Sequence, residues 1–87
     1  MRIEVVDKCL GNKVWILMQD DKEYYGVLRG FDEYLNIVLD DVMEYQDSGE
    51  GGRRTLVSPV NIESMLLNGS HVCMMIPGDN PPPKGDN

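Results

Sequence analysis

The sequence predicts a mainly β domain: an N-terminal helix followed by a strongly bent, five-stranded antiparallel sheet that forms a small open barrel. Three observations carry this prediction. The hydrophobic period changes from helical to two after residue 12. Two glycines interrupt the second alternating segment, which is typical of a strand that bends sharply. The chain has 87 residues, too few to cover both faces of a flat sheet, so a sheet that closes on itself is favoured.

The helix is predicted over residues 2–10. Ile3, Val6 and Leu10 recur at i, i+3 and i+7, which indicates one short helix with a single buried stripe. Gly11 then ends it, since glycine commonly follows the last helical residue.

The strands are predicted from alternating apolar residues and from the turn residues between them. Gly26 and Gly30 lie inside the second strand, where they indicate a curl. Residues 53–61 stay ambiguous, because Pro59 is unsuited to a central strand. Asn68 and Gly69 together are a strong hairpin signal. The predicted strands are residues 13–19, 23–31, 35–45, 62–67 and 72–76.

Composition predicts one domain over residues 1–78 and a disordered Pro/Gly-rich tail over residues 79–87. A domain of this size buries only about 60% of its unfolded surface, so its core is marginal. An open barrel also leaves strand edges, which invite pairing with another chain. Both points favour a partner subunit.

Charge and apolar patterning exclude several classes of protein. Eight basic against fifteen acidic residues give a net charge of −7, which argues against coating a phosphate backbone or docking on anionic lipid. No apolar run approaches the roughly 18 residues of a membrane span, and residues 1–10 do not read as a signal peptide. Cys9 and Cys73 lack the spacing of a disulfide framework or zinc site. We therefore expect an intracellular protein without membrane contact or cofactor, with both cysteines reduced and partly buried.

Two stretches carry a family resemblance. Residues 26–39 contain a Gly, an apolar residue two positions later, then Asp32-x-aromatic-x-Asn36 and a Leu. Residues 65–72, Met-Leu-Leu-Asn-Gly-Ser-His-Val, follow after a variable loop. In this order and on this strand pattern, they resemble the two motifs of the Sm and Sm-like (LSm) proteins, and the resemblance covers roughly residues 2–77.

The resemblance implies a fold and a function. Sm-like proteins assemble as six- or seven-membered rings in which the fourth strand of one subunit, here residues 62–67, pairs with the fifth strand of the next, here residues 72–76. The ring binds uridine-rich single-stranded RNA near its central hole. LSm heteroheptamers bind the oligouridine 3′ end of the U-six spliceosomal small nuclear RNA, or serve cytoplasmic mRNA decapping and decay, which implies both nucleus and cytoplasm. Whether this chain alone closes a homomeric ring stays open.

The first motif supplies three candidate RNA-site residues. The resemblance implies that Tyr34 stacks on a base, and stacking is worth roughly 1–3 kcal/mol; alternatively its ring lies half-buried against its own loop. Asn36 is implied to read uracil, because an amide both donates and accepts hydrogen bonds; alternatively it is a turn residue bonded to backbone. Asp32 either orients Asn36 or only caps the turn.

The second motif supplies two further candidate RNA-binding residues, Asn68 and Gly69, which the resemblance places in the other half of the RNA pocket. Most Sm-like proteins have Arg at the position of Asn68, where its guanidinium packs on the base, so we expect a weaker nucleotide contact here. Gly69 is expected to serve the turn by adopting a positive φ.

The other polar or aromatic residues are better explained by structural roles than by RNA binding or catalysis. His71 is interpreted as a surface or packing residue rather than a functional one, and Arg53 with Arg54 as a solvated basic pair rather than a phosphate contact. Trp15 lies opposite the core face of its strand, and the sequence does not say what it contacts. The acidic pairs at 20–21 and 40–41 are explained by turns and a bulge, because neighbouring strand residues point to opposite faces.

Three functions of different class compete. The leading one is a non-catalytic ring subunit that binds uridine-rich RNA. The second is a scaffold that completes a ring while its neighbours hold the RNA, which the Asn at position 68 favours. An enzyme is the weakest, because the sequence shows no nucleophile beside a base, no metal-ligand cluster and no phosphate-binding glycine loop.

Overall fold

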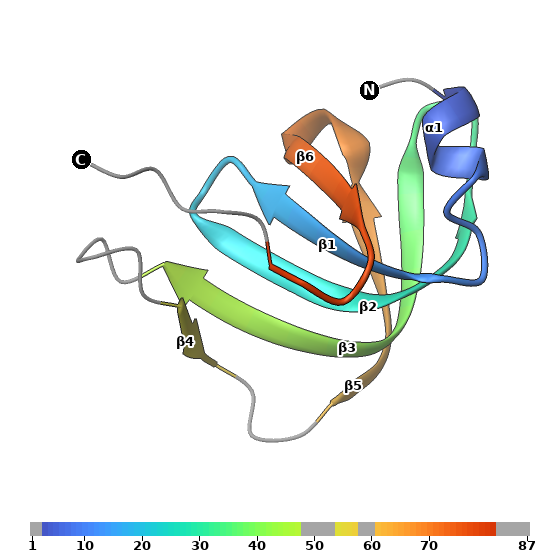
Figure 1. Cartoon of the computed structure of the whole chain (residues 1–87). Helices are drawn as coiled ribbons and strands as arrows, with labels where there is room; N and C mark the ends of the chain where they lie inside the picture. Colours follow the sequence, from blue (N-terminus) through green and yellow to red (C-terminus); the bar gives the residue numbers. More distant parts are fainter. Residues whose placement is uncertain (1–2, 48–53, 58–60, 82–87) are drawn as a thin grey trace.

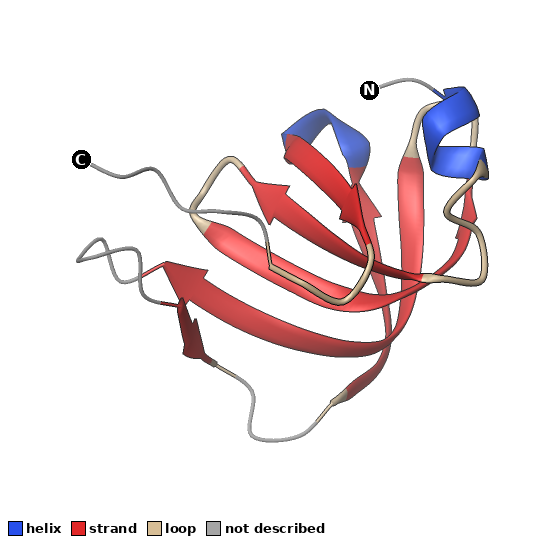
Figure 2. Cartoon of the chain, in the orientation of Figure 1, coloured by secondary structure: helices blue, strands red, loops and turns tan. Residues whose placement is uncertain are grey.

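The computed structural model describes residues 3–47, 54–57 and 61–81. Figure 1 shows curved strands with the N-terminal helix at an end of the molecule, and Figure 2 shows that strands make up most of the described chain. No helix in these described ranges is long and apolar enough to cross a membrane. The elements are α1 (Ile3–Asp7), β1 (Lys13–Met18), β2 (Lys22–Phe31), β3 (Asn36–Asp47), β4 (Arg54–Leu56), β5 (Ile62–Asn68), the 3₁₀ helix η1 (Gly69–His71) and β6 (Val72–Pro77).

The strands form one antiparallel sheet that bends into an open barrel. The strand order is β4-β3-β2-β1-β6. β5 also pairs with β3, along its first part, whereas β4 pairs with its last three residues. Figure 1 shows β1, β2 and β3 curving together, with β5 crossing near the bend of β3. The predicted fold class, a helix followed by a bent antiparallel sheet, is confirmed.

Residues 53–61, which the sequence left ambiguous, contain the short additional strand β4. β4 pairs with the last three residues of β3, from Tyr45 opposite Leu56 to Asp47 opposite Arg54. The sheet therefore has six strands rather than the five predicted, with β5 and β6 as the predicted fourth and fifth. Pro59 and the loop over 48–53 lie outside the described residues.

The predicted helix is too long, and two of the three residues of its predicted buried stripe are exposed. Within the described part of the predicted helix, residues 3–7 are helical; Val6 is buried as predicted, whereas Ile3 is 43% and Leu10 is 40% exposed. The chain continues as a turn in which the Cys9 N–H donates to the carbonyl of Val6, 2.9 Å. That turn buries Cys9 beside Val6 and moves Leu10 off the buried face. Gly11 was predicted to end the helix, but the helix ends at Asp7, and Gly11, with φ 80°, ends the turn that follows it.

The bend at Gly26 is explained by a close backbone approach. A Cβ atom at Gly26 would lie 2.8 Å from the carbonyl oxygen of Asp40 on β3. The β2–β3 register shifts at this place and again between Leu28 and Gly30, so both glycines lie at irregularities of the strand, as expected. The space around Gly30 is open, with no atom within 4 Å of a Cβ built there.

The barrel core is formed by the inward-facing side chains of five strands and by the N-terminal turn. Its fully buried members include Ile16, Leu28, Ile37 and Leu39. Leu67 of β5 and Cys9 of the turn after α1 also belong to this core. Burying side chains of this size contributes about 1.5–3 kcal/mol each, offset by chain entropy.

A second cluster lies on the opposite face of the sheet, and the sequence did not predict it. Trp15, Tyr25 and Tyr45 come from β1, β2 and β3, with ring centroids 4.8 Å apart for Trp15 and Tyr25 and 5.1 Å apart for Trp15 and Tyr45. Trp15 is only 4% exposed. The residue whose contacts the sequence left open is therefore buried inside its own chain, and it is not a free contact surface.

An ion pair covers one side of this aromatic cluster. The Nε of Arg54 on β4 donates to Oε1 of the buried Glu23 on β2, 2.7 Å, and its guanidinium lies 5.6 Å from the Trp15 ring. The prediction of a solvated Arg54 is therefore wrong, since β4 carries its side chain over the sheet. Arg53 lies outside the described residues.

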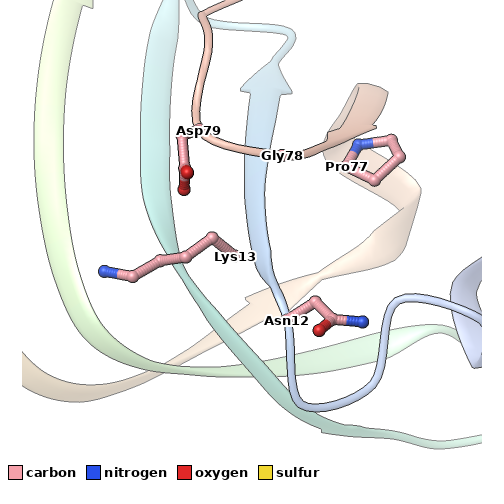
Figure 3. Close-up of a pocket in the computed structure, with 5 residues that line it drawn as sticks. All are labelled: Asn12, Lys13, Pro77, Gly78 and Asp79. Carbon is pink, nitrogen blue, oxygen red and sulfur yellow. The ribbon is translucent and has the colours of Figure 1, made fainter.

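The segment after β6 covers the other side. Gly78 adopts φ 109° and donates its N–H to the carbonyl of Lys13, 2.9 Å. Asp79 then accepts hydrogen bonds from Trp15 and Tyr25, although the sequence assigns this residue to the tail. Figure 3 shows Lys13 and Asp79 pointing to one side of an open hollow, and Asn12 and Pro77 to the other. Residues 82–87 of the predicted tail lie outside the described residues.

Candidate functional site

The two motif segments meet in space through the pairing of β3 with β5. Asn36, the first residue of β3, lies opposite Asn68, the last residue of β5. Opposed residues of antiparallel strands share a face, with Cβ atoms about 5 Å apart. The connection over residues 32–35 and the 3₁₀ helix η1 therefore lie beside each other at this end of the sheet.

Asp32 holds the connection together. Its Oδ1 accepts from the backbone N–H of Tyr34 and of Asn36, each at 2.9 Å, and its Oδ2 accepts from Nδ2 of Asn36, 2.9 Å. These hydrogen bonds favour the charged carboxylate, so the donated amide of Asn36, the largest contribution, lowers the pKa of Asp32 below its ordinary value. Asp32 therefore makes both contacts considered from the sequence: it orients Asn36 and it closes the turn.

The amide of Asn36 has a defined orientation. Because Nδ2 donates to the carboxylate of Asp32, Oδ1 of the same amide points away from it as a hydrogen-bond acceptor. The backbone N–H of Asn36 is also occupied by Asp32. Asn36 thus presents to a ligand the acceptor Oδ1, held in direction by the carboxylate of Asp32, and the second N–H of Nδ2.

Tyr34 lies between Asp32 and Asn36 in the chain, with its ring largely in solvent. It is 76% exposed, the highest value among the large hydrophobic residues that are exposed in the described ranges. Its backbone N–H is fixed by Asp32, 2.9 Å. The alternative of a ring half-buried against its own loop does not match this exposure.

Asn68 caps η1 with its side chain. Its Oδ1 accepts from the backbone N–H of Ser70, 3.0 Å, and from the Ser70 hydroxyl, 2.9 Å. Side-chain acceptors at such a position are worth about 1 kcal/mol to a short helix end. The acceptor of Asn68 is therefore used inside the chain, and its Nδ2 is the group left for a ligand.

The expected positive φ at Gly69 is wrong. Positive φ values occur at Gly11 and Gly78 among the described glycines, and not at Gly69. The predicted two-residue hairpin turn is also absent, because Gly69 begins η1. What requires glycine is a close approach: a Cβ atom at Gly69 would lie 2.0 Å from the carbonyl oxygen of Leu35.

Leu35 is a residue that sequence reasoning missed. It has φ 60°, a left-handed conformation that costs a residue with a side chain roughly 1–2 kcal/mol. Its N–H donates to the carbonyl of Asp32, 3.0 Å, and its side chain packs against the core. No pattern in the sequence signals this conformation, because leucine is common in strands and helices.

Gln19, directly after β1, and Ser70, inside η1, were also missed; Gln19 attaches η1 to the end of β1. The N–H of Gln19 donates to the carbonyl of His71, 2.9 Å, and its Nε2 lies 3.5 Å from the carbonyl of Ser70. His71 itself is exposed, which matches the interpretation as a surface residue rather than a packing residue.

The two acidic pairs at 20–21 and 40–41 and the two cysteines lie outside the connection over residues 32–35 and outside η1. Asp21 and Asp41 have positive φ, so the acidic pairs do occupy turns and a bulge. In the described ranges, no group of three or more His, Cys, Asp or Glu side chains is arranged to hold a metal ion. Both cysteines are free; Cys9 is buried, and burial raises its pKa, whereas Cys73 is exposed rather than partly buried as expected.

Comparison with known proteins identifies the family. Residues 4–77 match the LSM domain. The chain is 45% identical over 92% of its length to the Dictyostelium discoideum probable U6 snRNA-associated Sm-like protein LSm5, of which the match covers 77%. It is 47% identical over 91% of its length to the Schizosaccharomyces pombe LSM complex subunit lsm5, of which the match covers 90%.

Solved structures agree on the fold. A heptameric archaeal Sm protein matches 87% of this chain and 98% of its own, with TM-score 0.68 and 25% identity. A Pyrococcus abyssii Sm protein, solved in complex with a uridine heptamer, matches 90% of this chain and 99% of its own, with TM-score 0.72. At 23% identity this second structure bears on the fold alone.

Segments 6–11 and 66–69 of this chain look most like the fifth eukaryotic LSm protein, and the relatives named LSm5 confirm that similarity. The two motifs lie on paired strands of a bent sheet, and the domain match spans nearly the whole described chain. The chain therefore belongs to the Sm-like (LSm) family.

Proposed function

We propose that this chain is a non-catalytic subunit of a heteroheptameric LSm ring that binds uridine-rich single-stranded RNA. In the nucleus the ring binds the oligouridine 3′ end of the U6 spliceosomal small nuclear RNA and acts in pre-mRNA splicing. In the cytoplasm it acts in mRNA decapping and decay.

The observation that carries the RNA proposal is the orientation of Asn36. Its Oδ1 is an acceptor held in place by the Asp32 carboxylate on Nδ2. The Watson–Crick edge of uracil carries an N3–H donor between two carbonyl acceptors, and cytosine carries an acceptor at N3. An acceptor at Asn36 that faces N3 of the base therefore favours uracil over cytosine, whose own donor is the amino group at C4, and the Nδ2 of Asn68 is a donor for a uracil carbonyl.

The exposed ring of Tyr34 supports stacking beside this reading group. An aromatic side chain can stack on any base, at roughly 1–3 kcal/mol per base. A site of this kind depends on stacking and amide hydrogen bonds rather than on many phosphate contacts. It is therefore compatible with a chain whose net charge is −7.

The two sheet edges support assembly into a ring. Within the described residues, β5 pairs with β3 and β6 pairs with β1, and neither strand has a second neighbour. Leu66 of β5 is 67% exposed and Met74 of β6 is 49% exposed. Pairing of β5 with β6 of the next subunit covers both edges and adds apolar burial to a small core.

The cellular roles rest on the family. The name of the Dictyostelium relative refers to U6 snRNA, which supports the nuclear role. The cytoplasmic role in decapping and decay follows from the resemblance to LSm proteins that serve both rings.

A ring-completing scaffold is the second candidate, and the cap at Asn68 favours it. Because Oδ1 of Asn68 is used by Ser70, this side of the site presents one amide donor and no stacking cation. In this alternative the neighbouring subunits carry most of the RNA contact.

Titration of an oligouridine into the assembled ring tests both candidates. The variants are Tyr34→Ala, which removes the stacking ring, and Asn36→Ala, which removes the amide acceptor. We expect each to lower oligouridine affinity about tenfold, as loss of one stack or one base contact predicts. Glu33→Gln, in the same connection, serves as the control. Unchanged affinity in both variants of a ring that binds RNA supports the scaffold, and absence of oligouridine binding by the unmodified ring contradicts the proposal.

A further inference from the structure

We propose that Leu35 and Gly69 are positioning residues of this site, and that their backbone contact determines where Tyr34 and Asn36 lie. The inference rests on the proposed function, because it concerns how the proposed uridine site keeps its shape. Neither residue needs to touch RNA for this role.

Leu35 determines the direction of the chain between the two candidate contact residues. Its φ of 60° sends the backbone through a sharp change of direction directly after Tyr34 and directly before Asn36. A return of Leu35 to an extended conformation therefore rotates the Tyr34 ring relative to the Asn36 amide. The left-handed conformation persists only where neighbouring atoms hold it.

The hydrogen bonds of Asp32 do not attach this connection to the rest of the protein, so they do not by themselves keep Leu35 in its left-handed conformation. Among the described residues they run to the backbone of Tyr34 and to the backbone and side chain of Asn36, all within residues 32–36. They give the connection its internal shape. They do not attach it to η1.

Gly69 supplies the external contact. Its backbone lies so close to Leu35 that an added Cβ would stand 2.0 Å from the Leu35 carbonyl oxygen and 2.7 Å from its Cβ. Both neighbouring atoms are on or next to the backbone of Leu35, so a flexible side chain cannot move aside to make room. Leu35 is held from the other side by its packing against the core. The connection is thus confined between the core and η1, and its position follows from both.

The test compares Gly69→Ala with Gly30→Ala in the full chain. Gly30 lies near the end of β2, one residue before Phe31, and a Cβ there meets no atom within 4 Å. Both variants make the same chemical change, so a difference between them reports the contact with Leu35. Affinities for oligouridine and oligoadenosine are measured on the assembled ring, and the pKa of the Asp32 carboxyl is measured by NMR on the chain without RNA.

We expect Gly69→Ala to lower oligouridine affinity about tenfold, through loss of aligned stacking and amide contact. The oligoadenosine affinity changes less, so the ratio of the two affinities falls. The pKa of Asp32 rises towards its ordinary value as Asn36 moves away. Gly30→Ala changes neither the ratio nor the pKa.

Two results overturn the inference. One is a Gly69→Ala variant with the original affinity ratio and Asp32 pKa. The other is an equal loss for both RNAs with an unchanged pKa, because general destabilisation produces that pattern. If the unmodified ring binds no oligouridine, the proposed function fails, whereas the pKa comparison still decides the role of Gly69.

Leu35→Gly covers the case in which Gly69→Ala does not fold. Glycine accepts φ 60° without strain but removes the side chain that packs against the core. We expect this variant to fold and to lose the preference for uridine. A Leu35→Gly chain with the original preference contradicts the positioning role.

Discussion

Trp15 and Asp79 join the first strand to the segment that follows the last one. The indole Nε1 of Trp15 donates to the backbone carbonyl of Asp79, 3.1 Å, while the hydroxyl of Tyr25 donates to the carboxylate of the same residue, 2.6 Å. Asp79, in the segment that follows β6, thus accepts hydrogen bonds from both β1 and β2. It covers an aromatic cluster on the outer face of the sheet.

Replacing Asp79 with Ala is expected to lower the free energy of unfolding by about 0.5–1.5 kcal/mol, the usual worth of one hydrogen bond. The variant loses the bond to Tyr25, and the carbonyl that accepts from Trp15 remains. Trp15 is the one tryptophan of the chain, so its fluorescence reports both local exposure and urea unfolding. We expect red-shifted emission and a lower midpoint. Asp79→Asn keeps an acceptor and serves as the control; equal effects of Ala and Asn refute a role for the acceptor.

Tyr25 is expected to titrate far above an ordinary tyrosine. The hydrogen bond to Asp79, followed by desolvation and the nearby negative charge, raises its pKa from 10.0 to about 12. Because the folded-state pKa is the higher one, the stability from this bond is fully present below pH 10 and is lost as the pH rises from about 10 to about 12. Absorbance of tyrosinate at high pH measures this, with Tyr25→Phe to assign the signal.

In Asp79→Ala, the late-titrating tyrosine is expected to move down towards the other tyrosines, since its strongest cause is removed. A titration that is identical with and without the Asp79 carboxylate contradicts this assignment.

The Glu23–Arg54 pair is expected to matter far more than the exposed pair of Arg29 with Asp40. Glu23 is 2% exposed, and removal of one member of a buried pair costs about 3–5 kcal/mol. Arg29 lies 3.0 Å from Asp40 at the surface, where such a pair is worth about 0–1 kcal/mol. We expect Arg54→Ala to destabilise the chain by about 3 kcal/mol and Arg29→Ala by less than about 1 kcal/mol. Chemical denaturation of both variants makes the comparison, and equal losses contradict it.

The two thiols are expected to differ in reactivity. Cys73 is exposed on β6, whereas Cys9 is buried and its pKa is raised by that burial, so it forms less thiolate. A thiol reagent added to the unassembled chain at neutral pH is expected to label one cysteine quickly and the second only on unfolding. Cys73→Ser removes the fast phase, and Cys9→Ser leaves it. Two fast-reacting thiols in the folded chain disagree with the burial of Cys9.

The pattern of apolar residues and glycines along the sequence was sufficient to predict those features of the fold that depend on short segments. The alternation of Val14 and Ile16, the turn at Gly11 and the bends at glycine are properties of short segments, and the structure shows them. The helix was overestimated because three apolar residues at helical spacing do not reveal that the chain turns after Asp7.

The sequence alone determined the succession of a helix and five of the strands, the bent barrel, and the two motif segments with Asp32, Tyr34, Asn36, Asn68 and Gly69, but not β4. Only the tertiary structure decided what these residues touch. Asn36 meets Asn68 through the β3–β5 register, and Gly69 is glycine because of Leu35 rather than because of its own φ. Likewise Trp15 is buried by Arg54 and Asp79, which come from distant segments. Each of these contacts joins residues far apart in the chain, and the free energy that selects them comes from packing that a local pattern does not contain.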